Sequence, residues 1–159
     1  MTGDDVVQKI IDLLLDNKIT FQLWEHEPTP SSEDSAKVRG MRMEEGRKAM
    51  ILKGRKSGNR IMIVIPSNLK IDMKKVKAKL GEEFQFEDPE VIFKDFGVKI
   101  GGVPPLGNIF GLETYFDNDT RLEKRSAFNC GLQTKSIIMD TDDLIKVVNP
   151  IFVDLKKQL

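Results

Sequence analysis

Apolar side chains near the N-terminus recur with the period of a helix. They fall at Val6, Val7, Ile10, Ile11, Leu14 and Leu15, which is the spacing that buries one face of a helix. Asp4 and Asp5 lie in the first turn, where the helix dipole favours carboxylates. The pattern therefore predicts a helix from Asp4 to Asp16, followed by a strand from Thr20 to Glu25, where apolar and polar residues alternate.

The central part of the chain alternates between strand-like and helix-like segments. Two apolar runs, from Lys48 to Leu52 and from Ile61 to Ile65, flank a basic connection that contains glycine, and they predict a β-hairpin. Capping residues followed by apolar positions predict three helices. One is capped by Ser31 or Ser32 and closed by Gly40, one runs from Asp72 to Gly81, and one runs from Asp88 to Gly97.

The remaining segments complete a mixed architecture. Short strands are predicted at Phe84 to Phe86, Ile109 to Phe116, Ser126 to Asn129 and Ser136 to Met139. Thr141 to Asp143 then cap a last helix that runs through Val148. Because strands and helices mix without strict βαβ alternation, we expect one α+β domain over residues 1–159, with flanking helices around one mixed sheet.

The composition narrows the classes of protein that fit this pattern. The chain has 159 residues, 40% of them apolar, and its 25 basic and 25 acidic residues argue against a wholly basic nucleic-acid module. A single cysteine, Cys130, excludes an internal disulfide and, with a single histidine, disfavours a zinc site built from Cys and His. We expect no metal and no cofactor, as the family resemblance given below also implies. The acidic N-terminus and the lack of a long apolar run predict a cytoplasmic protein with no membrane partner.

Positive charge is nevertheless concentrated in one part of the chain. Residues 47–79 contain eleven lysines and arginines and one acid, Asp72. The four lysines at positions 74, 75, 77 and 79 fit the solvated face of a helix. The cations at positions 48, 53, 55, 56 and 60 gather on the predicted hairpin and its start. They suit a phosphate-bearing partner such as an RNA end, although they would equally suit a nucleotide or an acidic protein. The candidate phosphate-binding residues of the hairpin are Lys53, Arg55, Lys56 and Arg60.

A loop rich in glycine and proline lies between the third predicted helix and the strand that follows. Lys99 to Gly107 holds three glycines and two prolines in nine residues. Glycine lets backbone or ligand approach closely, and proline fixes φ, so the segment is typical of a stiff, shaped loop. On composition alone, a structural turn is the commoner interpretation of such a cluster.

Two other patterns do not indicate a catalytic site. Asp95-Phe96-Gly97 matches the metal-binding tripeptide of kinases, but no glycine-rich ATP loop accompanies it. Nothing in the sequence brings His26 and Cys130 together as a base and a nucleophile, and a structural role at a strand end is the commoner one for such a histidine.

Four segments, in this order, resemble the family of YbaK and the domain associated with prolyl-tRNA synthetase. They are Trp24 to Pro28, Arg47 to Leu52, Asp72 to Val76 with Asp88-Pro89, and Gly101 to Gly107, in which Gly101 to Pro105 matches the Gly-x-x-x-Pro loop of the family. Asn129-Cys130-Gly131 and Asp142-Asp143-Leu144 also fall where the family has a glycine turn and an Asp-Leu pair.

The resemblance implies both a fold and an activity. The fold would be a curved mixed sheet with flanking helices. The activity would be trans-editing: hydrolysis of the ester that joins a wrong amino acid to tRNA, without a metal or a covalent intermediate. The expected partners are the acceptor end of mischarged tRNA and prolyl-tRNA synthetase, and the expected substrate is tRNA(Pro) charged with a small amino acid such as Ala or Cys.

The resemblance also implies roles for individual residues. Lys48 and Gly101 would be catalytic, with Lys48 binding a phosphate or the ester carbonyl. Contacts to the substrate would come from Trp24, His26, Ala49, Gly102, Pro105, Gly131 and Asp143. The phosphate-bearing partner of Lys53, Arg55, Lys56 and Arg60 would be the tRNA. Without the family, Lys48 could be a strand-end lysine, Trp24 could pack in the core and Asp143 could cap a helix. Ala49 replaces a threonine of many relatives, and Pro104 lacks an N–H donor.

Two other functions fit the same residues. The domain could be a catalytically inactive module that binds tRNA or a synthetase. It could also be a regulator that binds a small aminoacyl nucleotide.

Overall fold

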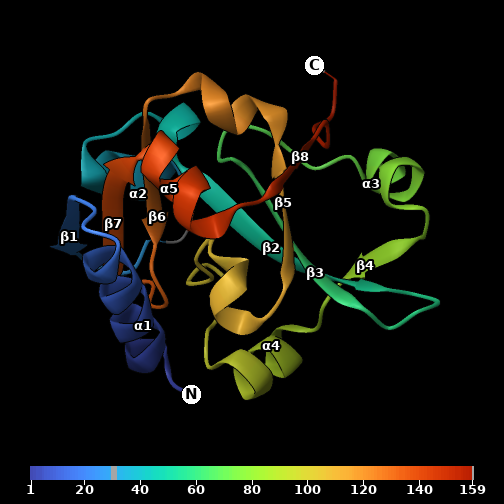
Figure 1. Cartoon of the computed structure of the whole chain (residues 1–159), viewed down its shortest axis with the longest axis horizontal. Helices are drawn as coiled ribbons and strands as arrows, with labels where there is room; N and C mark the ends of the chain where they lie inside the picture. The colour runs from blue at the N-terminus through green and yellow to red at the C-terminus, as the bar shows by residue number, and fades with distance from the viewer. Residues whose placement is uncertain (30–31, 159) are drawn as a thin grey trace.

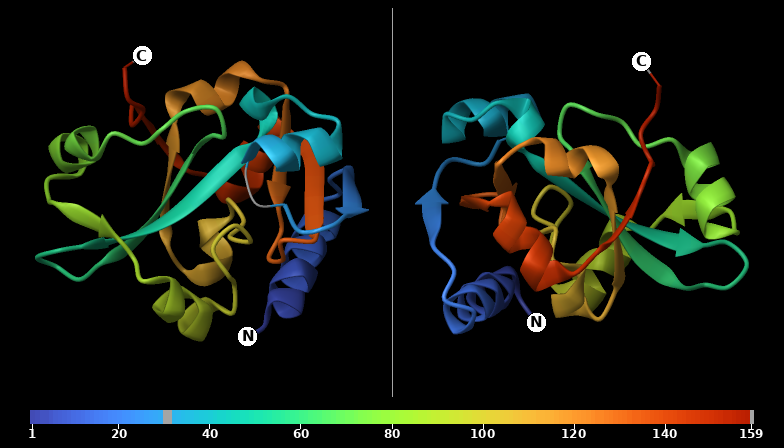
Figure 2. Two further views of the ribbon diagram at one scale, coloured as in Figure 1. Left: turned by 180° about the vertical axis from the view of Figure 1, so that it is seen from behind. Right: turned by 45° about the horizontal axis from the view of Figure 1, so that its top comes forward.

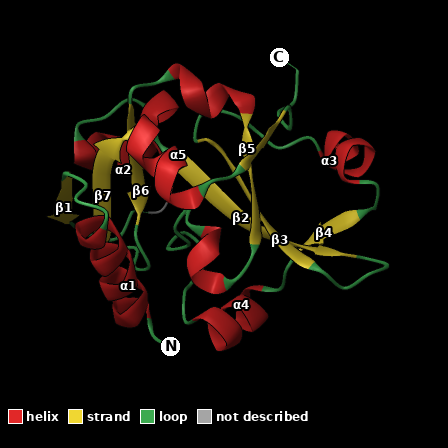
Figure 3. Cartoon of the chain, viewed as in Figure 1, coloured by secondary structure: helices red, strands yellow, loops and turns green. Residues whose placement is uncertain are grey.

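A five-stranded mixed sheet forms the centre of the molecule in this computed structural model, which describes residues 1–29 and 32–158 (Figures 1 and 3). Its order is β4 (Phe84–Phe86), β2 (Arg47–Gly54), β3 (Arg60–Pro66), β5 (Glu113–Asp117) and β8 (Ile151–Val153). The β2–β3 and β2–β4 pairs are antiparallel, whereas β3–β5 and β5–β8 are parallel. The tip of the predicted β2–β3 hairpin projects beyond the other elements (Figure 2).

A smaller antiparallel sheet stands beside the first. It consists of β1 (Phe21–Glu25), β7 (Lys135–Asp140) and β6 (Arg125–Asn129), in that order. A single parallel bridge between Gly46 and Ala127 joins the two sheets. The α+β class is confirmed, but the strands of the described residues form two sheets and not the one sheet that the sequence predicted.

The helices follow the predicted capping signals closely. They are α1 (Gly3–Asp16), α2 (Ser32–Arg39), α3 (Met73–Leu80), α4 (Pro89–Phe96) and α5 (Thr141–Val148). Asp72 and Asp88 cap α3 and α4 by accepting backbone N–H bonds, and Gly81 and Gly97 end these helices in the left-handed conformation. The predicted cap at Ser31 lies outside the described residues. No described helix is both long and apolar enough to cross a membrane.

Several predicted elements differ from the structure by more than a residue or two at their ends. The predicted strand from Ile109 begins instead with a 3₁₀ helix, η2 (Gly107–Phe110), because Gly111 turns the chain with φ +70 before β5 starts. Two more 3₁₀ helices, η1 (Met43–Glu45) and η3 (Asn118–Leu122), occupy predicted loops. Thr141 is already helical, so the N-cap of α5 is Asp140, which makes no side-chain cap bond.

Alternation along β2 separates two apolar cores. Ile51 belongs to the larger core, which fills the space between the two sheets and helices α1, α4 and α5. Leu52 belongs to the smaller core, which includes Val76 of α3. Since side chains alternate along a strand, Ala49 shares the face of Ile51, while Lys48 and Met50 share the face of Leu52. This alternation decides where each candidate side chain points.

Candidate functional site

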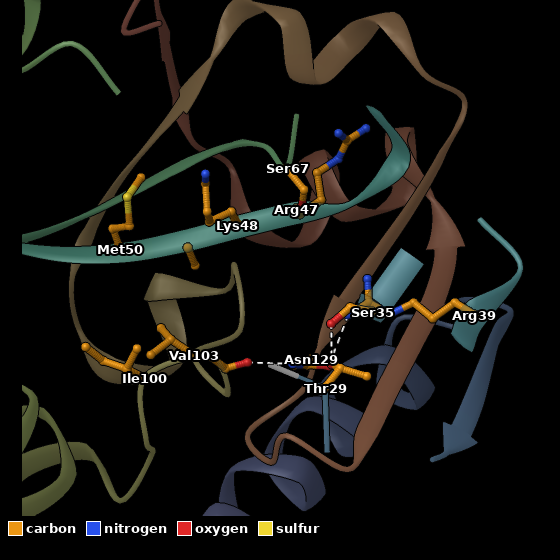
Figure 4. Close-up of a pocket in the computed structure, with 12 residues that line it drawn as sticks. Thr29, Ser35, Arg39, Arg47, Lys48, Met50, Ser67, Ile100, Val103 and Asn129 are labelled. Atoms are coloured by element: carbon orange, nitrogen blue, oxygen red, sulfur yellow. Dashed lines mark hydrogen bonds between the residues drawn. The ribbon is translucent and has the colours of Figure 1, made fainter. Parts of the chain in front are cut away.

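A cavity of about 350 Å³ lies between β2, α2 and the loop rich in glycine and proline (Figure 4). The β2 wall carries Lys48, Ala49 and Met50, and the loop contributes Ile100, Gly101 and Val103. The remaining wall is polar and is formed by Thr29, Ser35, Arg39, Arg47, Ser67 and Asn129. The structure therefore brings together three predicted site residues, Lys48, Ala49 and Gly101, from segments far apart in the chain.

The side chain of Asn129 connects the polar wall to the loop. Its Nδ2 donates to the carbonyl of Gly101 at 2.5 Å. Its Oδ1 accepts from Arg39 Nη2 and from Ser136 Oγ, each at 3.0 Å. Two donors on the oxygen fix the orientation of the amide, so that the nitrogen is directed to the loop.

Arg39 is a buried cation whose partners are neutral. Its side chain is buried, and its Nε donates to Ser136 Oγ at 2.9 Å. No carboxylate in the described part of the chain forms an ion pair with it. Burial lowers the pKa of the Arg39 guanidinium to about 10, so it stays charged at neutral pH. A buried charge without a counter-ion is costly, which is typical of a site that receives a polar or anionic ligand.

His26 extends this network and is not among the residues that line the cavity. Its Nδ1 contacts the carbonyl of Glu27 at 2.8 Å, and its Nε2 contacts Ser136 Oγ at 2.7 Å. A carbonyl can only accept, so Nδ1 carries a proton. The single proton of the Ser136 hydroxyl then has two competing acceptors, His26 Nε2 in the neutral ring and Asn129 Oδ1. His26 thus supports the polar wall and does not line the cavity.

Lys48 is half-buried and lies between this cavity and a second, larger one. Its ammonium donates to the carbonyl of Leu69 at 3.0 Å, on the face of β2 opposite to Ile100 and Val103 (Figure 4). Burial lowers the pKa of Lys48, and the neighbouring Lys70 ammonium lowers it further. One of the three donors of the ammonium is used in this bond, which leaves two for a ligand. Lys48 lines the second cavity as well as the first.

The turn after β6 holds the loop in place through three successive carbonyls. Gln133 Nε2 donates to the Ile100 carbonyl at 2.7 Å, Asn129 donates to the Gly101 carbonyl, and the N–H of Gly131 donates to the Gly102 carbonyl at 2.9 Å. Gly101 has φ +88, a value that favours glycine. The N–H of Gly101 donates to no acceptor within the described ranges, and Gly101 lines the cavity.

Gly102, Gly131 and Pro105 act on the loop and not on the cavity itself. Both glycines are buried, and a Cβ on Gly102 would lie 3.3 Å from the carbonyl oxygens of Gly131 and Lys99. Pro105 is a buried residue of the loop and is not among the lining residues. These three positions shape the loop, which supports an indirect role in place of the substrate contacts predicted for them.

Two predicted substrate contacts lie away from the cavity. Trp24 is 41% exposed on β1, where its Nε1 donates to Gln22, so it neither lines the cavity nor packs in the core. Asp143 lies in the first turn of α5 and lines a separate depression with Arg121 and Lys124. The structure therefore gives no support for contacts from these two side chains to a ligand in this cavity.

The predicted tRNA-binding cations lie near the hairpin tip, among acidic side chains. Arg60 pairs with Asp95 at 2.6 Å and stacks on Phe96, with its guanidinium carbon 4.7 Å from the ring centroid. Arg55 lies 3.9 Å from Glu83. The N–H of Lys56 donates to Glu82 at 3.1 Å, and Lys53 is exposed. Carboxylates so close reduce the attraction of this region for phosphates.

The polar wall of the cavity was not predicted from the sequence. Thr29, Ser35 and Arg39 occupy a helix and the segment before it, where no motif marks them, and Asn129 was noted only as part of a turn. The hydroxyls of Thr29 and Ser35 share a very short hydrogen bond. A buried arginine is detectable only once the fold places it beside Ser136, which is 97 positions away.

Comparisons with known proteins agree with this architecture. A model of the aminoacyl-tRNA editing domain matches residues 26–147. The chain is 24% identical to the multifunctional Ser/Thr-tRNA deacylase ProXp-y of Escherichia coli, over 98% of this chain and 95% of that protein. It is also 24% identical to the prolyl-tRNA editing protein ProX of Acetoanaerobium sticklandii, over 91% of each.

A solved structure shows the same fold. It is described as that of a candidate trans-editing enzyme for prolyl-tRNA synthetase, and it superposes with a TM-score of 0.84 at 20% identity, covering 96% of this chain and 98% of that one. The family match spans most of the chain and includes β2, the loop and β6. The resemblance to YbaK-like proteins is thus confirmed, and the chain belongs to the aminoacyl-tRNA editing domain family.

Proposed function

We propose that this protein hydrolyses the ester between an amino acid and the 3′ end of a mischarged tRNA, acting in trans as one domain over residues 1–159. Membership of the editing family supports this reaction class, and the relatives named above include two tRNA-editing proteins. The single observation that carries the proposal is the cavity shared by Lys48 and Gly101.

The cavity suits an aminoacyl ester held without covalent attachment. The free N–H of Gly101 is suited to the ester carbonyl, because a fixed donor stabilises the negative charge that develops there in the transition state. Ala49, Val103 and Ile100 offer an apolar surface for a small side chain. Water then attacks the carbonyl carbon, the bond to the ribose oxygen breaks, and the free amino acid leaves.

Lys48 is better placed to bind a phosphate than to contact the ester carbonyl. Its ammonium lies on the face of β2 opposite to the loop, at the junction of the two cavities. An ammonium there can hold the phosphate of the terminal nucleotide while the amino acid enters the cavity past Ala49. The role of Lys48 in this proposal is therefore to position the substrate end.

The amino acid removed is a small one. Ala or Cys on tRNA(Pro) is the first candidate, with prolyl-tRNA synthetase as the enzyme whose errors are corrected. Ser or Thr is the second, because hydroxyl and amide groups of Thr29, Ser35 and Asn129 form one wall of the cavity. A site built to hydrogen-bond a hydroxyl discriminates strongly against analogues that lack it.

A deacylation panel tests the proposal. The protein is incubated with tRNA charged with Ala, Cys, Ser or Thr, and the loss of ester is followed beside a buffer control and the Lys48→Ala variant. We expect at least one ester to be cleaved well above the buffer rate and Lys48→Ala to slow this cleavage. Binding of tRNA without any cleavage would instead favour the inactive binding module.

A further inference from the structure

A second cavity, of about 820 Å³, lies on the face of β2 opposite to the candidate active site. Lys48 and Met50 line both cavities, so the two meet at β2. The C-terminal chain forms another border, since Asp72 N–H donates to Leu155 at 2.8 Å and Lys157 N–H to Lys70 at 2.9 Å (Figure 2). We call this second cavity the lysine groove.

The lysine groove is strongly cationic. Lys48, Lys70, Lys74 and Lys157 line it, and none of them forms an ion pair with another residue of the described ranges. The only acid in its lining is Asp72, whose Oδ1 already accepts from the N–H groups of Lys74 and Lys75. Lys70, Lys74 and Lys157 are exposed. Such a cluster attracts a polyanion.

An exposed aromatic ring gives the groove a second property. Phe86 of β4 is 54% exposed and lies in the lining, beside the apolar side chains of Met50 and Met73. Cations beside an exposed ring are the two elements with which proteins bind single-stranded nucleic acid, because lysines bind the phosphates and the ring stacks on a base. An acidic peptide would use the lysines but would gain no comparable stacking on the ring.

The groove is electrostatically better suited to RNA than the hairpin tip. The cations near the tip lie beside Glu82, Glu83 and Asp95, whereas the groove lysines have no carboxylate partner in the described chain. The groove also leads to the candidate active site through Lys48. A ligand that occupies the groove can therefore deliver its end to the first cavity.

We propose that the lysine groove binds the single-stranded 3′ end of an RNA. Phosphates bind Lys70, Lys74 and Lys157, a base stacks on Phe86, and the terminal nucleotide passes Lys48 into the first cavity. This inference rests on the proposed function for the identity of the RNA, since mischarged tRNA carries its amino acid at such an end.

Binding of an uncharged RNA hairpin with a four-nucleotide 3′ overhang tests the groove, measured by fluorescence anisotropy over a series of salt concentrations. The groove variant is Lys70→Ala/Lys74→Ala/Lys157→Ala. The matched variant, Lys53→Ala/Arg55→Ala/Lys56→Ala, removes the same charge from the hairpin. The groove variant should bind more weakly and lose roughly two units of the slope of log Kd against log salt, at about 0.7 per phosphate contact. The hairpin variant should keep the wild-type slope.

Two further arms test the stacking and the single strand. Phe86→Ala should weaken binding between about 5-fold and 150-fold, with the salt slope unchanged, as expected for the loss of one stacked base. A blunt RNA hairpin should bind the wild type more weakly than the hairpin with the overhang. Equal binding of both RNAs, or a groove variant with wild-type affinity and slope, would overturn the proposal.

The outcomes separate this inference from the proposed function. If the groove variant loses affinity for the RNA but the wild type hydrolyses no ester, RNA binding by the groove is supported and the deacylase proposal fails. If the wild type hydrolyses an ester and the groove variant binds and hydrolyses as well as the wild type, the deacylase proposal stands and the groove is overturned.

Discussion

The side-chain amide of Asn129 donates to the carbonyl of Gly101 at 2.5 Å and so joins the end of β6 to the loop that borders the cavity. The two residues are 28 positions apart in the chain. Arg39 fixes the orientation of this amide from the other side. The conformation of the loop, and with it the free N–H of Gly101, therefore depends on a polar side chain that the loop itself does not contain.

Replacing Asn129 with aspartate should separate catalysis from folding. Asn129→Asp keeps the shape and the contact with Arg39, but it puts a carboxylate oxygen against the Gly101 carbonyl. We expect the loop to shift and kcat to fall about a hundredfold, as for a substrate displaced by about 1 Å. Single-turnover deacylation measures this effect.

The control for this variant is thermal unfolding. Because the new carboxylate can pair with the buried Arg39, the Tm of Asn129→Asp should not fall below that of the wild type. Wild-type kcat in the folded variant would show that the bond from Asn129 to Gly101 has no role in catalysis.

Arg39→Lys tests whether deacylation depends on the two separate donors of the guanidinium as well as on its charge. Arg39 reaches Ser136 through Nε and Asn129 through Nη2, a geometry that one ammonium cannot reproduce. The substitution keeps the positive charge. We expect the rate of deacylation to fall about tenfold, an effect equivalent to ~1.4 kcal/mol. Comparison of kcat and KM for wild type and variant checks it. Full activity in Arg39→Lys would mean that charge alone is sufficient.

Ala49→Thr should change the preference for the amino acid. Ala49 lines the cavity on the same face of β2 as Ile51, so a threonine there adds a methyl group and a hydroxyl to the space for the substrate side chain. One added methyl group is worth about 1–3 kcal/mol of discrimination. Relative rates for Ala-, Cys-, Ser- and Thr-tRNA should therefore change by about tenfold. Unchanged relative rates would mean that the side chain of the amino acid does not lie beside Ala49.

The thiol of Cys130 should make stability fall at high pH. Burial raises the pKa of Cys130 to about 12 from its ordinary value of 9.0. Above pH 9 the unfolded chain loses this proton while the folded chain keeps it, so the free energy of unfolding decreases as pH rises. Relative to Cys130→Ala, the wild type should be about 1 kcal/mol less stable at pH 10 than at pH 8.

Urea unfolding of both proteins at the two pH values measures that difference. The thiol should also react with an alkylating reagent only slowly in the folded protein, because the side chain is fully buried. An equal pH dependence in wild type and variant would contradict the assignment of the effect to Cys130.

Local signals explain which parts of the fold were predictable. The helices α3 and α4 have a capping aspartate at one end and a left-handed glycine at the other, and both signals lie within the helix sequence itself. By contrast, β8 has three residues and becomes a strand only by pairing with β5. The division into two sheets likewise depends on long-range pairing, which no local pattern encodes.

The candidate site likewise contains residues that a local motif predicts and residues that it does not. Lys48, Ala49 and Gly101 were found because their motifs are contiguous in the chain. Arg39 and Asn129 were missed because their roles arise from contacts across 90 positions. The direction of the Lys48 side chain also required the strand register, because its partner is the carbonyl of Leu69 and not the loop.

The most direct test of the central proposal is the rate at which the aminoacyl ester of a mischarged tRNA disappears with enzyme in excess. We expect first-order loss of the ester from at least one of Ala-, Cys-, Ser- or Thr-tRNA, much faster than in buffer, and a slower rate with Asn129→Asp. Loss at the buffer rate for all four charged tRNAs, from a folded wild-type protein, would contradict it.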